Sequence, residues 1–355
     1  MGTMKFSPRT SAAVFAAGTL AFTTACSSDT AAAPGEGGGE EGAIEIVTST
    51  SIWGDVAQAV ADTATGANVT VTPIITGNAV DPHSFEPTAA DIARADEADI
   101  VVAGGGGYDA WLYEPLSDQD KVIAPLPLIG HSHDHDHGEE GHDHEAHDHE
   151  GHDHEGHDHE GHDHEGAEHE SHEHGEEGHE GEHSHEVEML DGNEHIWYDT
   201  TAITVVAEKV AEQINAAVPE AGANADAVIE RVDSLHERIH ELPELNYVQS
   251  ESIADYITSH APMEDVTPES YRMAILNHAE PSAADLAELL DTIKGGDVSA
   301  LIYNPQTKTD LTERILAAAE EADLQVVEIG ETPPEDTNFL DYYDQVLGEL
   351  EALNP

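Results

Sequence analysis

A long tract of histidine and acidic residues interrupts the chain and limits what can fold around it. Residues 131–188 repeat the unit GHDHE, hold 20 of the chain's 26 histidines and contain no lysine or arginine. Such a segment has almost no apolar side chains with which to build a core, so we expect it to be disordered without metal. The folded part of the chain is therefore predicted to be built from the two pieces that flank this tract.

The first 42 residues have the pattern of an export signal followed by a tether. Lys5 and Arg9 precede an apolar stretch too short to span a bilayer, and small residues lead to Cys26, the chain's one cysteine. Because TTAC resembles a bacterial lipobox, we expect residues 1–26 to be a lipoprotein signal peptide and Cys26 to be lipidated. Residues 27–42 are rich in Gly, Ala and acid, which is typical of a flexible linker. The protein is expected outside the cytoplasm, anchored to the cell membrane by this lipid.

Short apolar runs alternate with segments of helical spacing on both sides of the tract. In residues 43–129 the runs include AIEIVTST, NVTVTPIIT and DIVVAGG, and after residue 242 they include NYVQSE, SALIYN and LQVVEIG. This alternation predicts parallel sheets with helices on both faces. Between the two regions, residues 199–242 have the apolar spacing of a long helix, and Pro219 and Gly222 mark where an interruption would fall.

The predicted fold class is therefore α/β, with two lobes on central parallel sheets joined by one long rigid helix, as in periplasmic binding proteins. The N-terminal lobe is predicted to span residues 43–198 including the tract, the connecting helix residues 199–242, and the C-terminal lobe residues 243–355. Ligands of such lobes bind outside the carboxyl ends of the strands. Candidate site residues are therefore expected at those ends.

The charge balance excludes some partners. The chain has 75 acidic residues against 11 basic ones, a formal net charge of -64. Such a surface repels nucleic acid and anionic lipid headgroups, so neither is expected as a partner. The tract holds 23 of the acids, so the remainder of the chain is also strongly acidic. We interpret this acidity as a solvated surface suited to a saline habitat.

Four side chains with metal-binding chemistry lie just after predicted strands or at helix starts. They are His83 in VDPHSFEPT, His195 in NEHIWYD, Glu251 in YVQSESIADY and Glu331 in VVEIGETPP. Since these positions are equivalent edges of the predicted lobes, we expect the four side chains to point into one crevice. Two imidazoles and two carboxylates make a complete shell for zinc and are acceptable for manganese.

The same segments resemble those of a known family. The VDPHSFEPT loop, the EHIWYD segment, the TST-IWGD opening, the S-E--A-Y helix start and the long helix are similar to those of the cluster A-I substrate-binding proteins, which bind zinc or manganese for ABC importers. The resemblance covers residues 44–353 apart from the tract, and it implies that His83 and His195 are ligands. Its third ligand, commonly His in zinc proteins and Glu in manganese proteins, corresponds here to Glu251.

The fourth ligand of this family is usually an acid after the last strand. Glu331 is the best match, with Glu328 and Asp336 as neighbouring alternatives. The family members that carry a long His-rich loop at this position are mostly zinc proteins. Neutral imidazole is a good zinc ligand and a poor manganese ligand, and many weak tethered sites raise the local metal concentration. We therefore expect zinc, with manganese as the alternative that Glu251 favours.

The predicted function is that of an extracytoplasmic solute-binding lipoprotein, a monomer that captures zinc and delivers it to the membrane permease of an ABC importer. A surface metal buffer or adhesin without a transporter is the alternative. No enzyme is expected, because a metallohydrolase needs an open coordination position and a base. The chain contains no nucleophile elbow or phosphate loop.

Other polar residues are given structural interpretations. His236 and His240 lie one turn apart on a charged helix face and are interpreted as surface groups, and His260 as a partner of a helix dipole. Trp197 is expected to shield the site beside His195. Three residues after one strand are candidates for hydrogen bonds to the ligand shell: Tyr303, Asn304 and Gln306.

Metal affinity is expected to fall below about pH 6, because imidazoles bind metal only when neutral and protonate in this range. The check is the zinc dissociation constant from about pH 5 to pH 8, measured by competition with a chelator. An affinity that stays flat over this interval would contradict a histidine-based site.

Overall fold

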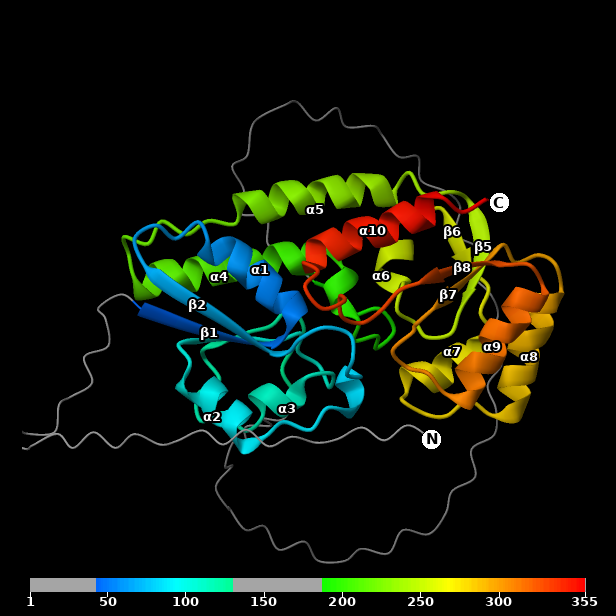
Figure 1. The fold of residues 1–355 in the computed structure, drawn as a ribbon, viewed down its shortest axis with the longest axis horizontal. Helices are drawn as coiled ribbons and strands as arrows, with labels where there is room; N and C mark the ends of the chain where they lie inside the picture. Colours follow the sequence, from blue (N-terminus) through cyan, green and yellow to red (C-terminus); the bar gives the residue numbers. More distant parts are fainter. Residues whose placement is uncertain (1–42, 130–186, 355) are drawn as a thin grey trace, which may run out of the picture. The chain divides into compact units, whose positions relative to one another are not determined.

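The structure is a computed structural model that describes residues 43–129 and 187–354 (Figure 1). The predictions for residues 1–42, including the signal peptide and the lipidation of Cys26, lie outside the described residues. The same holds for the predicted disorder of the tract, of which only residues 187 and 188 are described. Within the described ranges, no helix is long and apolar enough to cross a membrane.

The first sheet has four parallel strands. Their order across the sheet is β2 (Asn68–Ile75), β1 (Ala43–Thr50), β3 (Ile100–Val102) and β4 (Val122–Ile123). On β1, Ile46 pairs with Val71 on one side and with Ile100 on the other. The last five residues of β1 are all buried, as expected for an inner strand of a parallel sheet that is covered on both faces.

Helices cover both faces of this sheet. Ile46 enters a core shared with α1 (Ser51–Ala61), whereas the next residue, Val47, enters a separate core beneath α2 (Ala89–Glu97) and α3 (Ala110–Tyr113). Successive residues of β1 thus point to opposite faces, and Figure 1 shows α1 and the α2–α3 pair on opposite sides of the sheet.

The segment between the lobes forms two helices, α4 (Thr200–Ala217) and α5 (Asp226–Ile239), which pack against each other. The structure thus departs from the continuous helix expected over residues 199–242. Val218, which precedes Pro219, is extended rather than helical, because a proline disfavours the helical conformation in the residue before it. Gly222 then takes a φ of 70° and turns the chain.

The second sheet repeats the parallel arrangement. Its strand order is β6 (Met263–Asp265), β5 (Leu245–Gln249), β7 (Ala300–Tyr303) and β8 (Gln325–Glu328). The helices of this half are α6 (Asp255–Thr258), α7 (Glu269–Leu276), α8 (Ala283–Lys294), α9 (Asp310–Glu321) and α10 (Phe339–Glu351). The predicted fold class of two α/β lobes with parallel sheets is confirmed.

The last helix returns to the first half of the chain. α10 packs against both α1 and α5 (Figure 1), and the Phe339 N–H donates to the Asp55 carboxylate at 2.6 Å. The Tyr343 hydroxyl donates to the carbonyl of Tyr198 at 2.7 Å. One continuous apolar core consequently runs from α1 through α4 and α5 to α10 and β5. This shared core fixes the loops of the two lobes against each other.

Replacing Gly66 by alanine is expected to destabilise the protein by about 1–3 kcal/mol, the usual cost of forcing extra volume into packed structure. Gly66 lies between α1 and β2 and its N–H donates to the Ala221 carbonyl at 3.1 Å. A Cβ on Gly66 would lie 1.9 Å from the Glu220 carbonyl oxygen, so the loop between α4 and α5 would have to move.

The matched control is Gly348→Ala in α10, where an added Cβ meets nothing within 4 Å. Alanine has the better helix propensity, so this variant should be more stable by up to about 1 kcal/mol. Urea denaturation of both variants measures the two changes. Equal stabilities for Gly66→Ala and the parent protein would contradict the packing described here.

Candidate metal site

Two histidines and two glutamates from four separate loops meet at the carboxyl edges of the two sheets. His83 lies in the turn η1 (Pro82–Ser84) after β2, His195 directly before the turn η2 (Ile196–Tyr198), Glu251 after β5 and Glu331 after β8. Each offers a ligand atom, and these atoms all lie within 4.8 Å of one another. The structure therefore brings together the four residues predicted from the sequence.

The spacing of these atoms suits a small cation. His83 Nε2 lies 3.7 Å from Glu251 Oε1 and 3.6 Å from Glu331 Oε1, and His195 Nε2 lies 3.6 Å from Glu251 Oε1. In a tetrahedral zinc site with bonds of 2.0–2.1 Å, neighbouring ligand atoms are about 3.3 Å apart. Three of the six distances between ligand atoms are thus only a few tenths of an ångström longer than in such a site, and none exceeds 4.8 Å.

His195 has a buried nitrogen that lacks a partner. Its Nδ1 lies 2.8 Å from Asn193 Oδ1. The Asn193 amide nitrogen donates to the Ser252 carbonyl and the Asp255 carboxylate, so its oxygen must face His195. Nδ1 accordingly carries the proton, and Nε2 presents a lone pair. That Nε2 is buried without a hydrogen-bond donor, which a metal ion would satisfy.

His83 is placed by its local turn. The Asp81 carboxylate caps η1 by accepting the His83 N–H at 2.9 Å, and Pro82 fixes the first residue of the turn. The His83 ring meets the Tyr108 ring edge-on at a centroid distance of 4.9 Å. Its side chain keeps 23% of its surface exposed, compared with 8% for His195. His83 is therefore the ligand candidate on the solvent side.

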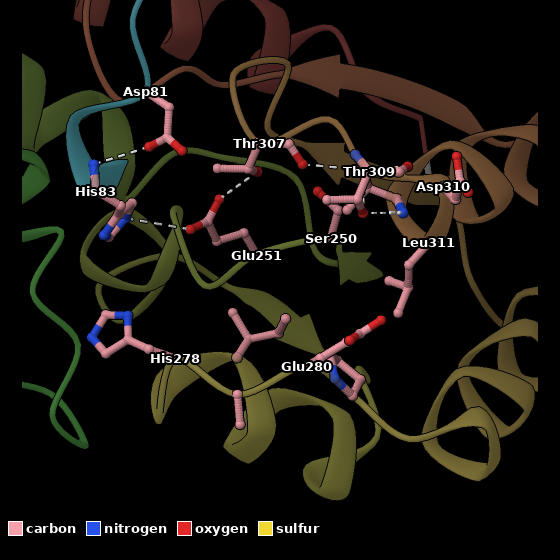
Figure 2. Close-up of a pocket in the computed structure, with 14 residues that line it drawn as sticks. Asp81, His83, Ser250, Glu251, His278, Glu280, Thr307, Thr309, Asp310 and Leu311 are labelled. Carbon is pink, nitrogen blue, oxygen red and sulfur yellow. Dashed lines mark hydrogen bonds and ion pairs between the residues drawn. The ribbon is translucent and has the colours of Figure 1, made fainter. Parts of the chain in front are cut away.

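The two carboxylates are held by neutral donors. The Asn304 amide donates to Glu251 Oε2 and, at 3.0 Å, to Glu331 Oε1. The Tyr108 hydroxyl donates to Glu331 Oε2 at 3.0 Å. The Thr307 hydroxyl donates to Glu251 Oε2 at 2.9 Å, as Figure 2 shows. These bonds leave Glu251 Oε1 directed at both imidazoles. Among the described residues, no lysine or arginine forms an ion pair with either carboxylate.

Burial and charge shift the protonation of this site away from that of free side chains. Burial, followed by repulsion from Glu251, raises the pKa of Glu331 well above its usual value. Burial, followed by the neighbouring His83 and His278, lowers the pKa of His195 well below its usual value. Both shifts disfavour the charged forms in the metal-free protein, so protonation of His195 lies below the pH range in which the loss of affinity was expected. A divalent cation would reverse the penalty on the carboxylate and bind the neutral imidazole.

The site opens to solvent on the side of His83. A cavity of about 520 Å³ is lined by Asp81, His83, Glu251 and His278 among others (Figure 2). The His278 ring lies 5.6 Å from the His83 ring, and its Nε2 lies 3.9 Å from Glu194 Oε2. An ion could enter along this cavity and reach Glu251 and His83 before the buried pair.

The alternatives considered for the fourth ligand lie outside the cluster. Glu328 and Asp336 are exposed, whereas Glu331 is fully buried. Of the three candidates at the end of β7 and just after it, Asn304 makes the expected hydrogen bonds to the carboxylates. Gln306 instead bonds Thr332 at 2.9 Å, and the Tyr303 hydroxyl is buried without a partner.

Two supporting groups were missed by the sequence interpretation. Tyr108 follows β3 in the segment GGGGYDA, which carries no metal-ligand chemistry of its own. Asn193 lies two residues before His195, where a second-sphere partner could have been sought. Trp197, expected to shield the site, is fully buried with its ring 5.2 Å from that of His195.

The family and the solved structures that this chain resembles are metal-binding substrate-binding proteins rather than enzymes. Residues 46–353 match the family described as zinc-uptake complex component A, periplasmic, and the chain belongs to this family. The resemblance to the cluster A-I proteins noted from the sequence is thereby confirmed.

Individual relatives are more distant. The chain is 22% identical over 295 residues to the zinc-binding lipoprotein AdcA of Streptococcus pneumoniae, covering 78% of this chain and 48% of AdcA. It is 36% identical over 124 residues to the manganese-binding lipoprotein MntA of Halalkalibacterium halodurans, covering 33% of this chain and 36% of MntA. The chain thus spans about half the length of AdcA, and a smaller share of MntA.

Solved structures share the fold. The laminin-binding protein Lmb of Streptococcus agalactiae superposes with a TM-score of 0.56 at 16% identity, over 87% of this chain and 98% of Lmb. A crystal structure of ZnuA gives a TM-score of 0.53 at 18% identity, over 87% of this chain and 97% of that one. At these identities the likeness concerns the fold alone.

Asn304→Ala is expected to weaken metal binding roughly 10- to 100-fold, the usual cost of removing a group that orients ligands. The variant removes the one donor that both carboxylates share. Asn246→Ala is the control, because Asn246 lies at the opposite end of β5 and bonds only the Asp297 carbonyl through its side-chain nitrogen. Chelator competition measures both affinities, and equal values for the two variants would show that Asn304 does not position the site.

Proposed function

We propose that this protein captures Zn²⁺ outside the cytoplasm, with His83, His195, Glu251 and Glu331 as ligands, and delivers it to an ABC importer. The observation that carries the proposal is the buried, unpartnered Nε2 of His195 facing the Glu251 carboxylate. Such an arrangement is costly unless a cation joins the two groups. The metal is bound here as cargo, since the site holds no group arranged for chemistry on a second substrate.

Several features favour zinc over manganese. Two imidazole nitrogens and two carboxylate oxygens, four potential ligand atoms in all, match the tetrahedral N and O sites of zinc. Manganese prefers more oxygen ligands in octahedral geometry. The His-rich tract of residues 131–188 would collect zinc and raise its concentration near the site. The family description and the zinc-binding relative AdcA point the same way. Glu251 and the manganese-binding relative MntA favour the other ion.

The N-terminal sequence and the relatives support the proposed delivery to a permease. AdcA and MntA are both lipoproteins by name, and Cys26 follows an export signal that resembles a lipobox. A lipid on Cys26 and the tether of residues 27–42 would keep the folded part close to the membrane. The permease would then receive zinc from a monomeric, loaded protein.

The test of the metal assignment is a competition of zinc against manganese on the mature, unlipidated chain and on a companion lacking residues 131–188. Both should bind one zinc ion tightly, and manganese should not displace it. His195→Gln should lower this affinity by more than the roughly 100-fold that outer-sphere changes cost. His278→Gln, the same change at an exposed histidine outside the ligand set, should have a much smaller effect.

Preferential binding of manganese would overturn the zinc assignment, and an unchanged affinity in His195→Gln would overturn the site. Zinc uptake in a strain that lacks the gene tests delivery separately. Unchanged growth of that strain under zinc limitation would favour a surface metal buffer or adhesin instead.

A further inference from the structure

The histidines outside the tract fall into two groups of three. His83, His195 and His278 lie at the site described above, and the remaining three also cluster. The ring of His236 lies 4.7 Å from that of His240 and 5.3 Å from that of His260, and the last two rings are 6.1 Å apart. We propose that His236, His240 and His260 form a second, weaker binding site for a divalent transition metal such as Zn²⁺.

Two of the three nitrogens already have the spacing of metal ligands. His236 and His240 lie one turn apart at the end of α5, and their Nε2 atoms are 3.1 Å apart. Neighbouring nitrogens around tetrahedral zinc are about 3.3 Å apart. Without a metal ion, one Nε2–H donates to the other Nε2. For both Nε2 atoms to bind a metal ion, the donor ring would carry its proton on Nδ1 instead. Histidines at i and i+4 on one helix face are a common arrangement for binding zinc.

Thr200 fixes the orientation of the first ring. Its hydroxyl oxygen lies 3.0 Å from His236 Nδ1, at the start of α4. This bond engages Nδ1 and turns Nε2 toward His240, which is the role of outer-sphere partners in metal sites. The orientation of His236 is thus set by a residue of another helix rather than by chance on an open surface.

His260 would complete the site after a rotation of its side chain. It lies in the turn between α6 and β6, and its side chain is exposed, so rotation meets little resistance. Among the described residues, only the His83 set has all of its potential ligand atoms within 4.8 Å of one another. Part of the free energy of binding at the second site is therefore spent on rotating the His260 side chain, and this site is expected to bind metal more weakly than the first.

The surroundings favour a cation. Asp199 and Asp233 lie near enough to His236 to act on its charge. A cavity of about 360 Å³ beside His236 is lined by Asp233 and Glu208, which could supply a fourth ligand or a water-mediated contact. Arg238, which lies between His236 and His240 in the sequence, forms ion pairs with Asp344 and Glu351 of α10. Three imidazoles select zinc, copper or nickel over manganese.

The test is histidine carbethoxylation of the mature full chain, read residue by residue by mass spectrometry while Zn²⁺ is titrated. His236, His240 and His260 should become protected together, at a zinc concentration above that which fills the first site. Mn²⁺ should not protect them. Protection of none of the three, or of each at unrelated concentrations, would overturn the proposal.

Two variants test the geometry. His260→Gln should raise the zinc concentration that half-protects His236 and His240, and Thr200→Val should do so by roughly tenfold through loss of the orienting bond. His278→Gln is the matched control and should leave protection of the cluster unchanged. Unchanged protection in both Thr200→Val and His260→Gln would show that the three rings do not share one ion.

The same protection experiment on the His195→Gln variant tests whether the three-histidine cluster binds zinc independently of the first site. In His195→Gln the first site is lost, whereas the three-histidine cluster should still be protected by zinc. Loss of protection at the cluster in that variant would mean that it only responds to the first site.

Discussion

Two carboxylates buried close together, with no lysine or arginine of the described residues paired to either, are the constraint on which this site depends. Glu331 is fully buried, Glu251 nearly so, and both share a single amide donor, Asn304. Neutral donors lower the cost of burying such charge but do not cancel it. The unpartnered His195 Nε2 adds a lone pair to the same space. A divalent cation bound here would compensate both carboxylates and the unpartnered nitrogen at once.

The fold brings the four potential ligand side chains together. Parallel strands end at the same edge of each sheet, so residues far apart in the sequence, such as Glu251 and Glu331, emerge as neighbours. The core that runs from α1 through α4 and α5 to α10 holds the two sheets in fixed positions relative to each other. Tyr108 then crosses from the first lobe to Glu331 of the second, and Gln306 of the second bonds the carbonyl of Val80 in the first. The ligand atoms are thus positioned by rigid elements on both sides.

Much of this arrangement was predictable, because buried parallel strands such as β1 and β7 leave apolar runs that are easy to locate. The predicted ligands also carried distinct chemistry at strand ends. Strand β6 was not predicted, because its sequence MED is short and mostly polar. Helix α7 was not predicted either, because Tyr271 is its one buried residue. The position of the break at Pro219 was predicted from the sequence. That the two resulting helices pack against each other was not, because it depends on tertiary contacts.

The three-histidine cluster shows where sequence reasoning ends. His236 and His240 were interpreted as surface groups because their helix face is charged, and His260 was considered separately. Only the fold brings the turn after α6 against the end of α5. Asn193 and Tyr108 were missed for the same reason: amide and phenol groups acquire a role at a metal site through position, not through their type.

The most direct test of the central claim is a crystal structure of the zinc-loaded protein with anomalous scattering data at the zinc absorption edge. We predict one strong peak bonded to nitrogens of His83 and His195 and to oxygens of Glu251 and Glu331, at about 2.0–2.2 Å. A strongest peak elsewhere, or a zinc ion bound without either carboxylate, would contradict it.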